Sequence, residues 1–419
     1  MCKRKLRIVL LLLVAVVVGS NHESVAQAQA AKEAANRLPH ASPAAVGMNE
    51  LVLERIDTVV AEGLRRKLMP GCVVLIARDQ RIVFHRAYGS KRLKPSVEPM
   101  TVDTVFDMAS ITKPVATATS VMKLVELGKI EINAPVAEYI PEFAAKGKGD
   151  VTILQLLTHQ AGLIPDNSIR DYDNGAEEAF RRIYDLSFYR PPGTKFVYTD
   201  VGFILLADVV KRVSGLNVDE FSRKHVFKPL GMTETGYLPT ANLKKRAAPT
   251  EKRDGKWMQG EVHDPRAFRL GGVAGHAGLF STADDVAIYA AMMTNGGTLN
   301  GTKILEPQTV QTMTKAYTIA DGNQRGLGWD KRTGFSYNRG DLLSAAAFGH
   351  GGFTGTVLWM DPELNLTFVF LSNRVHPDGK GSVNRLAGRI ATLAAASIEQ
   401  REESKAGEVL SGIDVLRAN

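Results

Sequence analysis

The alternation of apolar and polar residues predicts strands near both ends of the chain. Between residues 48 and 69, apolar residues recur every three to four positions, which is the spacing of an amphipathic helix. Two strand-like runs follow, residues 72–77 and 82–87, and the polar residues 78–81 between them predict a hairpin. Near the other end, residues 356–360 and 366–371 predict a second hairpin, and residues 383–396 predict a closing helix.

The section between these hairpins has a helical pattern. Between residues 110 and 293, apolar stretches are broken by loops rich in glycine and proline, and helices are expected over residues 111–127, 151–158, 176–186 and 201–213. Strands at both ends around a helical middle indicate an α+β fold, with an antiparallel sheet built from both termini and an inserted helical subdomain. We expect a single domain over residues 31–398 and a charged tail over residues 399–419.

The first thirty residues have the pattern of a signal peptide. Basic residues at positions 3–7 precede the apolar residues 8–19, and small and polar residues follow up to Ala30. The apolar stretch is shorter than the roughly 20 residues that span a membrane as a helix. We therefore expect a secreted or periplasmic protein that keeps no stable membrane span once the leader, residues 1–30, is removed.

Charge and cysteine content narrow the possibilities. The formal net charge is +8, and the leader takes away four basic residues and one acidic residue, which leaves +5. So mild an excess, spread along the chain, gives no indication of nucleic-acid binding. Without the leader Cys72 is the only cysteine, so no internal disulfide can form, and its apolar neighbours predict a buried strand position.

Ser110 and Lys113 are the candidate nucleophile and base. They stand three positions apart where a strand-like segment changes to a helix, so they share one helical face. A serine hydroxyl is a poor nucleophile, and a lysine whose charged form is disfavoured can take its proton. Ser120 and Lys123 have the same spacing, but they lie in the middle of an apolar helix where their side chains would serve packing.

Residues 106–114, Phe-Asp-Met-Ala-Ser-Ile-Thr-Lys-Pro, resemble the nucleophile segment of the β-lactamase-related serine hydrolases. That family of penicillin-recognising enzymes includes class C β-lactamases, D,D-peptidases and certain esterases. The resemblance implies catalysis through an acyl-enzyme on Ser110 without a cofactor, in a β-lactamase/penicillin-binding-protein transpeptidase-like fold.

The family's second motif, Tyr-x-Asn, corresponds to Tyr198 and Asp200, which follow a Pro-Gly loop and precede an apolar helix. The resemblance implies that Tyr198 helps Lys113 to move protons. Residues 172–174 fit Tyr-x-Asn by letter but lack this setting. Asp200 replaces the usual asparagine, and a carboxylate would favour a charged Lys113, so either Tyr198 takes more of the base role or Asp200 positions Lys113 and substrate.

The third motif is Lys-Thr-Gly or a His-x-Gly variant, and residues 350–352 resemble the variant. Residues 332–334 match the letters less well and lie in a polar loop. Small side chains at Gly351 and Gly352 would let a substrate approach the strand edge closely. The resemblance places an oxyanion hole at the N–H groups of Ser110 and Phe353. A largely neutral His350 would hold a substrate carboxylate less strongly than lysine does.

Four further polar residues are conspicuous. His159 matches a structural histidine of the family, whereas His276, in a glycine-rich segment, fits either a residue lining the site or a structural histidine. Zinc bound by His263, Asp264, His276 and His350 is conceivable, but their spacing matches no recurrent metal motif, so we expect no metal.

These observations predict an exported serine hydrolase that acts through an acyl-enzyme on amide or ester bonds. Peptidoglycan-derived D,D-peptides or other amides are the expected substrates, and esters of small acyl compounds are the alternative. A non-catalytic wall-binding or sensor protein that keeps the fold is a rival from another class, supported by Asp200. A metal-dependent hydrolase is a third possibility.

Overall fold

The computed structural model of the protein describes residues 36–399. The expected leader, residues 1–30, and residues 400–419 of the expected tail lie outside the described residues. None of the helices between residues 36 and 399 combines the length and apolarity needed to cross a membrane.

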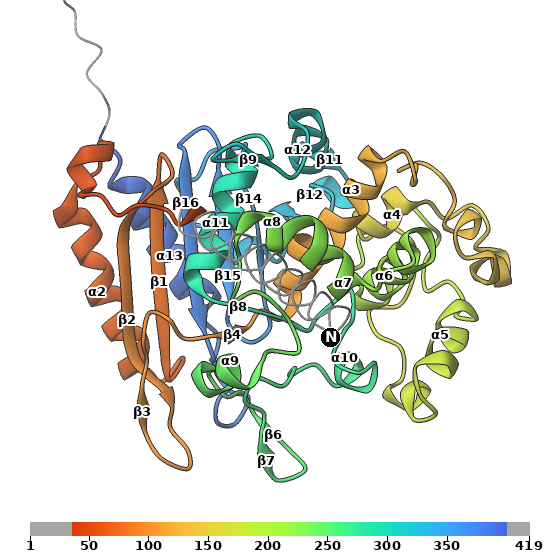
Figure 1. The fold of residues 1–419 in the computed structure, drawn as a ribbon, viewed down its shortest axis with the longest axis horizontal. Helices are drawn as coiled ribbons and strands as arrows, with labels where there is room; N and C mark the ends of the chain where they lie inside the picture. The colour runs from red at the N-terminus through yellow and green to blue at the C-terminus, as the bar shows by residue number, and fades with distance from the viewer. Residues whose placement is uncertain (1–35, 400–419) are drawn as a thin grey trace, which may run out of the picture.

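The two ends of the chain meet in one antiparallel sheet of nine strands (Figure 1). The order is β11-β12-β13-β14-β15-β16-β1-β2-β3, and β1, from near the beginning of the chain, pairs with β16, from near its end, so that Cys72 stands opposite Ser372. The strands are β1 (Gly71–Arg78), β2 (Arg81–Arg92), β3 (Glu98–Pro99), β11 (Tyr317–Thr318), β12 (Gln324–Arg325), β13 (Asp330–Arg332), β14 (Phe348–Gly351), β15 (Val357–Asp361) and β16 (Leu366–Ser372). The expected sheet built from both termini is therefore confirmed.

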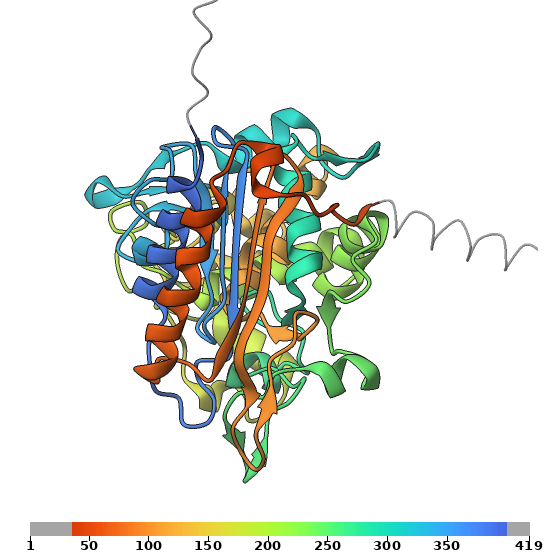
Figure 2. The ribbon, with the colours of Figure 1, turned by 90° about the vertical axis from the view of Figure 1, so that its left-hand side faces the viewer.

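One face of this sheet is covered by two helices that lie side by side, α2 (Glu50–Arg65) and α13 (Asn384–Ala396) (Figure 2). The Asn49 side chain caps α2 by accepting the N–H of Val52 at 3.3 Å. Alternate residues of β1 point to this face, and Cys72, Val74 and Ile76 are buried there. The predicted terminal helices, the two hairpins and the buried position of Cys72 are all confirmed.

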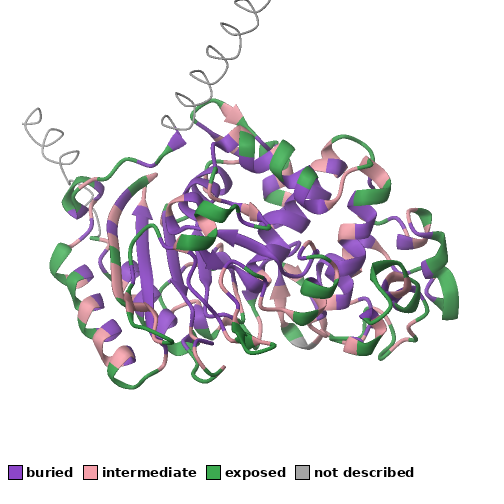
Figure 3. Ribbon diagram, turned by 60° about the horizontal axis from the view of Figure 1, so that its bottom comes forward, coloured by how far each residue is buried: buried purple, intermediate pink, exposed green. Residues whose placement is uncertain are grey.

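The other face is covered by α11 (Ala283–Thr294) and by the helical part of the molecule (Figures 1 and 3). Thr282 caps α11 by accepting the N–H of Asp285 at 3.4 Å. The helical part contains α3 (Thr119–Glu126), α4 (Ile153–Leu157), α5 (Ala176–Tyr184), α6 (Asp200–Ser214), α7 (Val218–Ser222) and α8 (Lys228–Leu230). The inserted helical subdomain that the sequence predicts is therefore present.

The expected continuous helix over residues 111–127 is wrong in detail. A 3-10 turn (Ala109–Ile111) is followed by a π-helix (Lys113–Ala118), and only then by α3. Pro114 has no N–H to donate, which an early position in a helix tolerates, and its carbonyl oxygen accepts the Thr119 hydroxyl at 2.9 Å. The wider π turn places Lys113 behind Ser110, and an apolar spacing of three to four cannot distinguish such a turn from an α-helix.

Short elements complete the fold, and apart from the strand-like segment before Ser110 they were not predicted. A small sheet, β4 (Phe106–Asp107), β8 (Leu279–Ser281) and β5 (Gly236–Tyr237), holds the segment before Ser110, because β8 pairs with both other strands. The remaining helices and strands are α9 (Ala241–Arg246), α10 (Pro265–Arg269), α12 (Pro307–Thr314), β6 (Lys252–Arg253), β7 (Lys256–Trp257), β9 (Thr298–Leu299) and β10 (Thr302–Lys303).

Candidate active site

A cavity of about 330 Å³ lies at the end of β14, where the sheet meets Ser110 and Tyr198. Six of the eight residues that the sequence predicts for the site line it: Ser110, Tyr198, His350, Gly351, Gly352 and Phe353. The other two, Lys113 and Asp200, lie directly behind Ser110 and contact each other. The fold thus brings together residues that are up to 243 positions apart in the chain.

Lys113 is fully buried, and its ammonium group has three close neighbours. Its Nζ atom donates to Ser110 Oγ at 3.0 Å and to the His276 carbonyl oxygen at 3.1 Å, and it lies 2.5 Å from Asp200 Oδ1. Two of its N–H groups therefore bind Ser110 and His276, and the Asp200 carboxylate forms an ion pair with the ammonium charge.

The pKa of Lys113 is raised above its usual value. Burial by itself would lower this pKa, but the Asp200 carboxylate and then the Tyr198 phenol favour the ammonium form and outweigh the effect of burial. The expectation that the charged form of Lys113 is disfavoured is therefore wrong for this resting state. Asp200 therefore favours a charged Lys113, as the sequence suggested for a carboxylate at this position. A charged Lys113 cannot accept a proton from Ser110.

Tyr198 lies in the loop that leads into α6, which begins at Asp200. Behind it, His159 Nδ1 accepts the N–H of Thr199 at 3.1 Å, and the rings of His159 and Tyr198 are 4.5 Å apart. Burial first, and then Arg325 and Lys113, hold the pKa of His159 well below its usual value. His159 is therefore a neutral residue that holds the Tyr198 loop in place, as expected of a structural histidine.

His350 is the third residue of β14 and is also neutral. Its Nδ1 lies 2.8 Å from the Gly351 carbonyl oxygen, which can only accept, so Nδ1 carries the proton and Nε2 is an acceptor. Burial first, and then Arg325 and Lys113, hold the pKa of His350 well below its usual value. The buried Nε2 atom has no partner within residues 36–399.

The turn after β14 packs against the segment that carries Ser110. A Cβ atom on Gly352 would lie 2.6 Å from the Met108 carbonyl oxygen, and one on Gly351 would lie 2.5 Å from Asn338 Nδ2. Both glycines therefore let the protein's own segments approach, in addition to lining the cavity as expected. Among the described residues, the N–H of Phe353 donates to no protein group, as an oxyanion donor requires.

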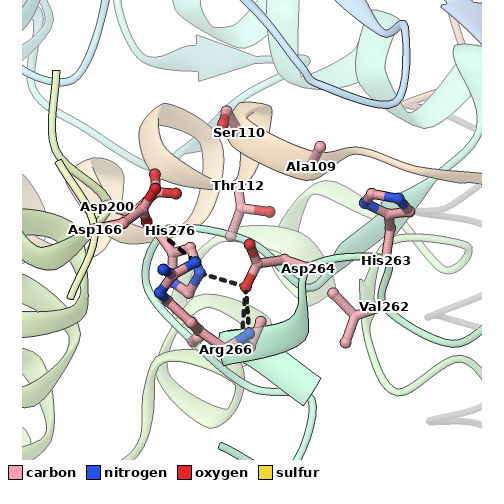
Figure 4. Close-up of polar contacts among 12 residues, drawn as sticks. Ala109, Ser110, Thr112, Asp166, Asp200, Val262, His263, Asp264, Arg266 and His276 are labelled. Atoms are coloured by element: carbon pink, nitrogen blue, oxygen red, sulfur yellow. Dashed lines mark hydrogen bonds and ion pairs between the residues drawn. The ribbon is translucent and has the colours of Figure 1, made fainter. Parts of the chain in front are cut away.

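The zinc set considered from the sequence is not assembled. His263 Nε2 binds Glu251 Oε2 at 2.6 Å, and His350 lies at the cavity. Asp200, Asp264 and His276 do converge, with ligand atoms within 4.8 Å of one another. However, Asp264 already accepts His276 Nε2 at 2.8 Å (Figure 4), and Asp200 already forms an ion pair with Lys113.

The model of the Beta-lactamase family matches residues 56–393, which is most of the chain. The chain belongs to the β-lactamase family. Members of this family are serine hydrolases, and the α+β fold expected from the resemblance is confirmed.

Two curated proteins are similar to this β-lactamase-family chain over most of their length. "N-acetylmuramyl-L-alanine amidase" of Bacillus subtilis (strain 168) is 32% identical over 77% of this chain and 81% of its own. "Putative D-alanyl-D-alanine carboxypeptidase" of Escherichia coli (strain K12) is 32% identical over 81% of this chain and 86% of its own.

Solved structures share the fold of this β-lactamase-family chain. A penicillin-binding protein homologue from Caulobacter crescentus superposes with a TM-score of 0.68 and 22% identity, over 84% of this chain and 99% of its own. A class C β-lactamase superposes with a TM-score of 0.69 and 17% identity, over 84% of this chain and 97% of its own.

The residues of the rival motifs in this family member are not among those that line the cavity. Ser120 is fully buried in α3 and donates to the Ala116 carbonyl at 2.6 Å, and Tyr172 donates to Asn167 at 2.8 Å. Thr333 donates to Asp330 at 3.0 Å in the loop after β13. The sequence that flanks each motif, rather than the motif residues alone, therefore distinguished the residues that the fold brings together from the rival matches.

Several residues that line this cavity were not predicted from the sequence, namely Arg325, Asp330, Phe335, Asn338 and Arg374. They belong to β12, β13, the loop 333–338 and the segment after β16, none of which has a catalytic spacing. Arg325 is fully buried, and its Nε and Nη1 atoms have no hydrogen-bond partner within the described part of the chain. Only the pairing of the strands in space brings these residues to Ser110.

Proposed function

We propose that the protein hydrolyses an amide bond of peptidoglycan-derived substrates through an acyl-enzyme on Ser110, after export directed by residues 1–30. One observation carries the proposal: Ser110 Oγ lies at the cavity on a hydrogen bond from the buried Lys113, with Tyr198 and the N–H of Phe353 at the same cavity. Both curated relatives bear the names of enzymes that cleave an amide bond in cell-wall material.

The reaction uses Ser110 Oγ as the nucleophile. It attacks the carbonyl carbon, and the carbonyl oxygen becomes an oxyanion held by the N–H groups of Ser110 and Phe353. Tyr198 takes the Ser110 proton while its own phenolic proton passes to the leaving nitrogen, and the C–N bond breaks. Water then attacks the acyl-enzyme ester by the same proton route in reverse, and Ser110 recovers its proton.

Lys113 acts as a fixed cation in this scheme. Its ammonium group orients Ser110 Oγ and favours negative charge at the Tyr198 oxygen during the transfer, and Asp200 keeps the ammonium charged. The neutral His350 adds no positive charge to the cavity that it lines, and its Nε2 is an unpaired acceptor among the described residues.

Ester hydrolysis is the second candidate function, and the neutral His350 favours it. A lysine in this position would supply a cation for the carboxylate of a D,D-peptide, whereas an imidazole without charge does not. Esters of small neutral acids need no such cation and place the same demands on Ser110 and the oxyanion donors.

Three substrates distinguish these functions: N-acetylmuramyl-L-alanine, a diacylated Lys-D-Ala-D-Ala peptide and p-nitrophenyl acetate. Chromatography of the products shows which bond is cleaved, and Ser110→Ala is the control. We expect amide cleavage that the control lacks. Cleavage of the ester alone would overturn the amide proposal in favour of an esterase, and Ser110-independent cleavage would overturn the mechanism. A protein that acts on none of the three and forms no acyl-enzyme would be the non-catalytic binding protein.

A further inference from the structure

We propose that Asp107 is a positioning residue for the reaction, because its carboxylate fixes both the backbone before Ser110 and the segment that supports Lys113. This inference rests on the proposed role of Ser110 as the nucleophile. It assigns a function to a buried acidic residue that does not line the cavity and takes no part in the proton transfer.

The first observation is the backbone at Ala109, directly before Ser110. Its φ is +45°, in the left-handed region that residues other than glycine avoid. Such a conformation persists only where its surroundings hold it. Asp107 Oδ1 accepts the N–H of Ala109 at 2.8 Å. The hydrogen bond therefore holds the amide of the strained residue itself. The direction of the Ser110 N–H, one of the two expected oxyanion donors, depends on this conformation.

The second observation is the other oxygen of the same carboxylate. Asp107 Oδ2 accepts the N–H of His263 at 2.7 Å, and the next residue, Asp264, accepts His276 Nε2 at 2.8 Å. The carbonyl of His276 in turn accepts from Lys113 Nζ at 3.1 Å. Figure 4 shows the segment that carries Ala109 and Ser110 beside the one that carries His263 and Asp264, with His276 next to Asp264. One carboxylate therefore joins the Ser110 backbone to the anchor of Lys113.

The chemistry of the link requires a carboxylate. Asp107 is buried, with a side chain that receives two backbone N–H groups, one at each oxygen. Burial raises the pKa of Asp107, and the two amides oppose this effect. An asparagine offers only one acceptor oxygen, and its amide nitrogen would face an N–H group, so it can keep only one of the two links.

The segment around Asp107 is also tied to the turn that carries Phe353. The Thr354 hydroxyl donates to the Asp107 carbonyl oxygen at 2.7 Å, and the Thr356 hydroxyl donates to the Met108 carbonyl oxygen at 3.1 Å. The two amides expected to form the oxyanion hole, those of Ser110 and Phe353, are therefore held relative to each other through residues 107 and 108. A shift of the Asp107 segment would change the distance between them.

The test measures phosphonylation of Ser110 by a fluorophosphonate in wild type and in Asp107→Asn, with intact-mass detection. Saturation kinetics separate the limiting rate from the binding constant of the probe. The matched control is Asp285→Asn, because Asp285 is also buried and accepts the Glu234 N–H at 2.9 Å and the Thr235 hydroxyl at 2.8 Å, but lies outside the cavity lining. The melting temperatures of all three proteins show how far each substitution destabilises the fold.

We expect the limiting rate of Asp107→Asn to fall by at least about tenfold, with the binding constant within about threefold of wild type, because a misplaced oxyanion donor affects only the reacting state. Asp285→Asn should keep the wild-type limiting rate, because Oδ2 alone receives both hydrogen bonds and an asparagine oxygen can keep them. A wild-type limiting rate in Asp107→Asn, or an equal loss in both variants, would overturn the inference alone. A wild type that forms no adduct on Ser110 would overturn the proposed function and the inference together.

A second pair of variants keeps the test decisive if Asp107→Asn does not fold. Thr354→Val removes the hydroxyl that donates to the Asp107 carbonyl, and Thr354→Ser keeps it. We expect the limiting rate to fall by about threefold or more in Thr354→Val and to stay near wild type in Thr354→Ser. Equal rates in the two variants would contradict the coupling between the Asp107 segment and the Phe353 turn.

Discussion

Lys113 Nζ lies 2.5 Å from Asp200 Oδ1, and this contact makes the lysine behind Ser110 a buried ammonium ion. The Asp200 carboxylate stands where the family usually has an asparagine amide. A carboxylate opposes the effect of burial, so the pKa of Lys113 is raised instead of lowered. In the proposed mechanism the proton of Ser110 therefore goes to Tyr198, and the charge of Lys113 orients Ser110 and stabilises the transfer.

Replacing Asp200 by asparagine tests this arrangement through the pH dependence of acylation. Without the carboxylate, burial acts on Lys113 unopposed and its pKa falls, so the ammonium form is lost at lower pH. We expect wild type to keep its rate of Ser110 phosphonylation up to about pH 10, because the pKa of Lys113 is raised, and Asp200→Asn to lose rate within that range. Rates measured from about pH 6 to about pH 10 give both profiles. Superimposable profiles in the two proteins would show that Lys113 is not needed as a cation.

The two buried neutral histidines predict a loss of stability in acid. Their pKa values in the folded protein are well below the value of about 6.5 expected when unfolded, so below that pH the unfolded chain binds more protons. Each group then lowers the free energy of unfolding by about 1.4 kcal/mol per pH unit. His159→Gln keeps an acceptor for Thr199 but cannot ionise. When the pH is lowered from about 7.5 to about 5, the free energy of unfolding of His159→Gln should fall by about 2 kcal/mol less than that of wild type, as measured by urea unfolding.

A methyl group on Gly352 should slow acylation more than a methyl group on a control glycine does. Its Cβ would lie 2.2 Å from Thr356 Oγ1 and 2.6 Å from the Met108 carbonyl oxygen, which pushes the Phe353 turn away from the Ser110 segment. We expect Gly352→Ala to acylate at least about tenfold more slowly. Gly334→Ala is the control, since a Cβ there meets no atom within 4 Å. A variant at Gly352 as active as this control would show that the close approach has no catalytic role.

Removal of metal ions distinguishes the serine mechanism from a metal-dependent one. Asp200, Asp264 and His276 are close enough to hold a cation, yet Asp200 is bound to Lys113 and Asp264 to His276. We expect hydrolysis to continue undiminished after dialysis against a chelator. Loss of activity that added zinc restores would favour a metal at these three residues over the ammonium of Lys113.

The sequence was sufficient for the two hairpins of the sheet, the terminal helices and six of the residues at the cavity, because hydrophobic periodicity and three motifs in family order define them. It could not define the short strands that hold Asp107, since a two-residue strand has no periodicity. It also could not define Arg325 or Asn338, which reach the cavity through pairing between distant strands. The ionisation of Lys113 depended on the distance to Asp200, which only the folded chain fixes.

The central claim, that Ser110 is an acylated nucleophile, is tested most directly by the intact mass of the protein after reaction with a fluorophosphonate and with a penicillin, followed by peptide mapping. We predict an adduct on Ser110 with at least one of the two reagents, and none on Ser110→Ala. A wild-type protein that keeps its unmodified mass with both, or an adduct that persists in Ser110→Ala, would contradict the account.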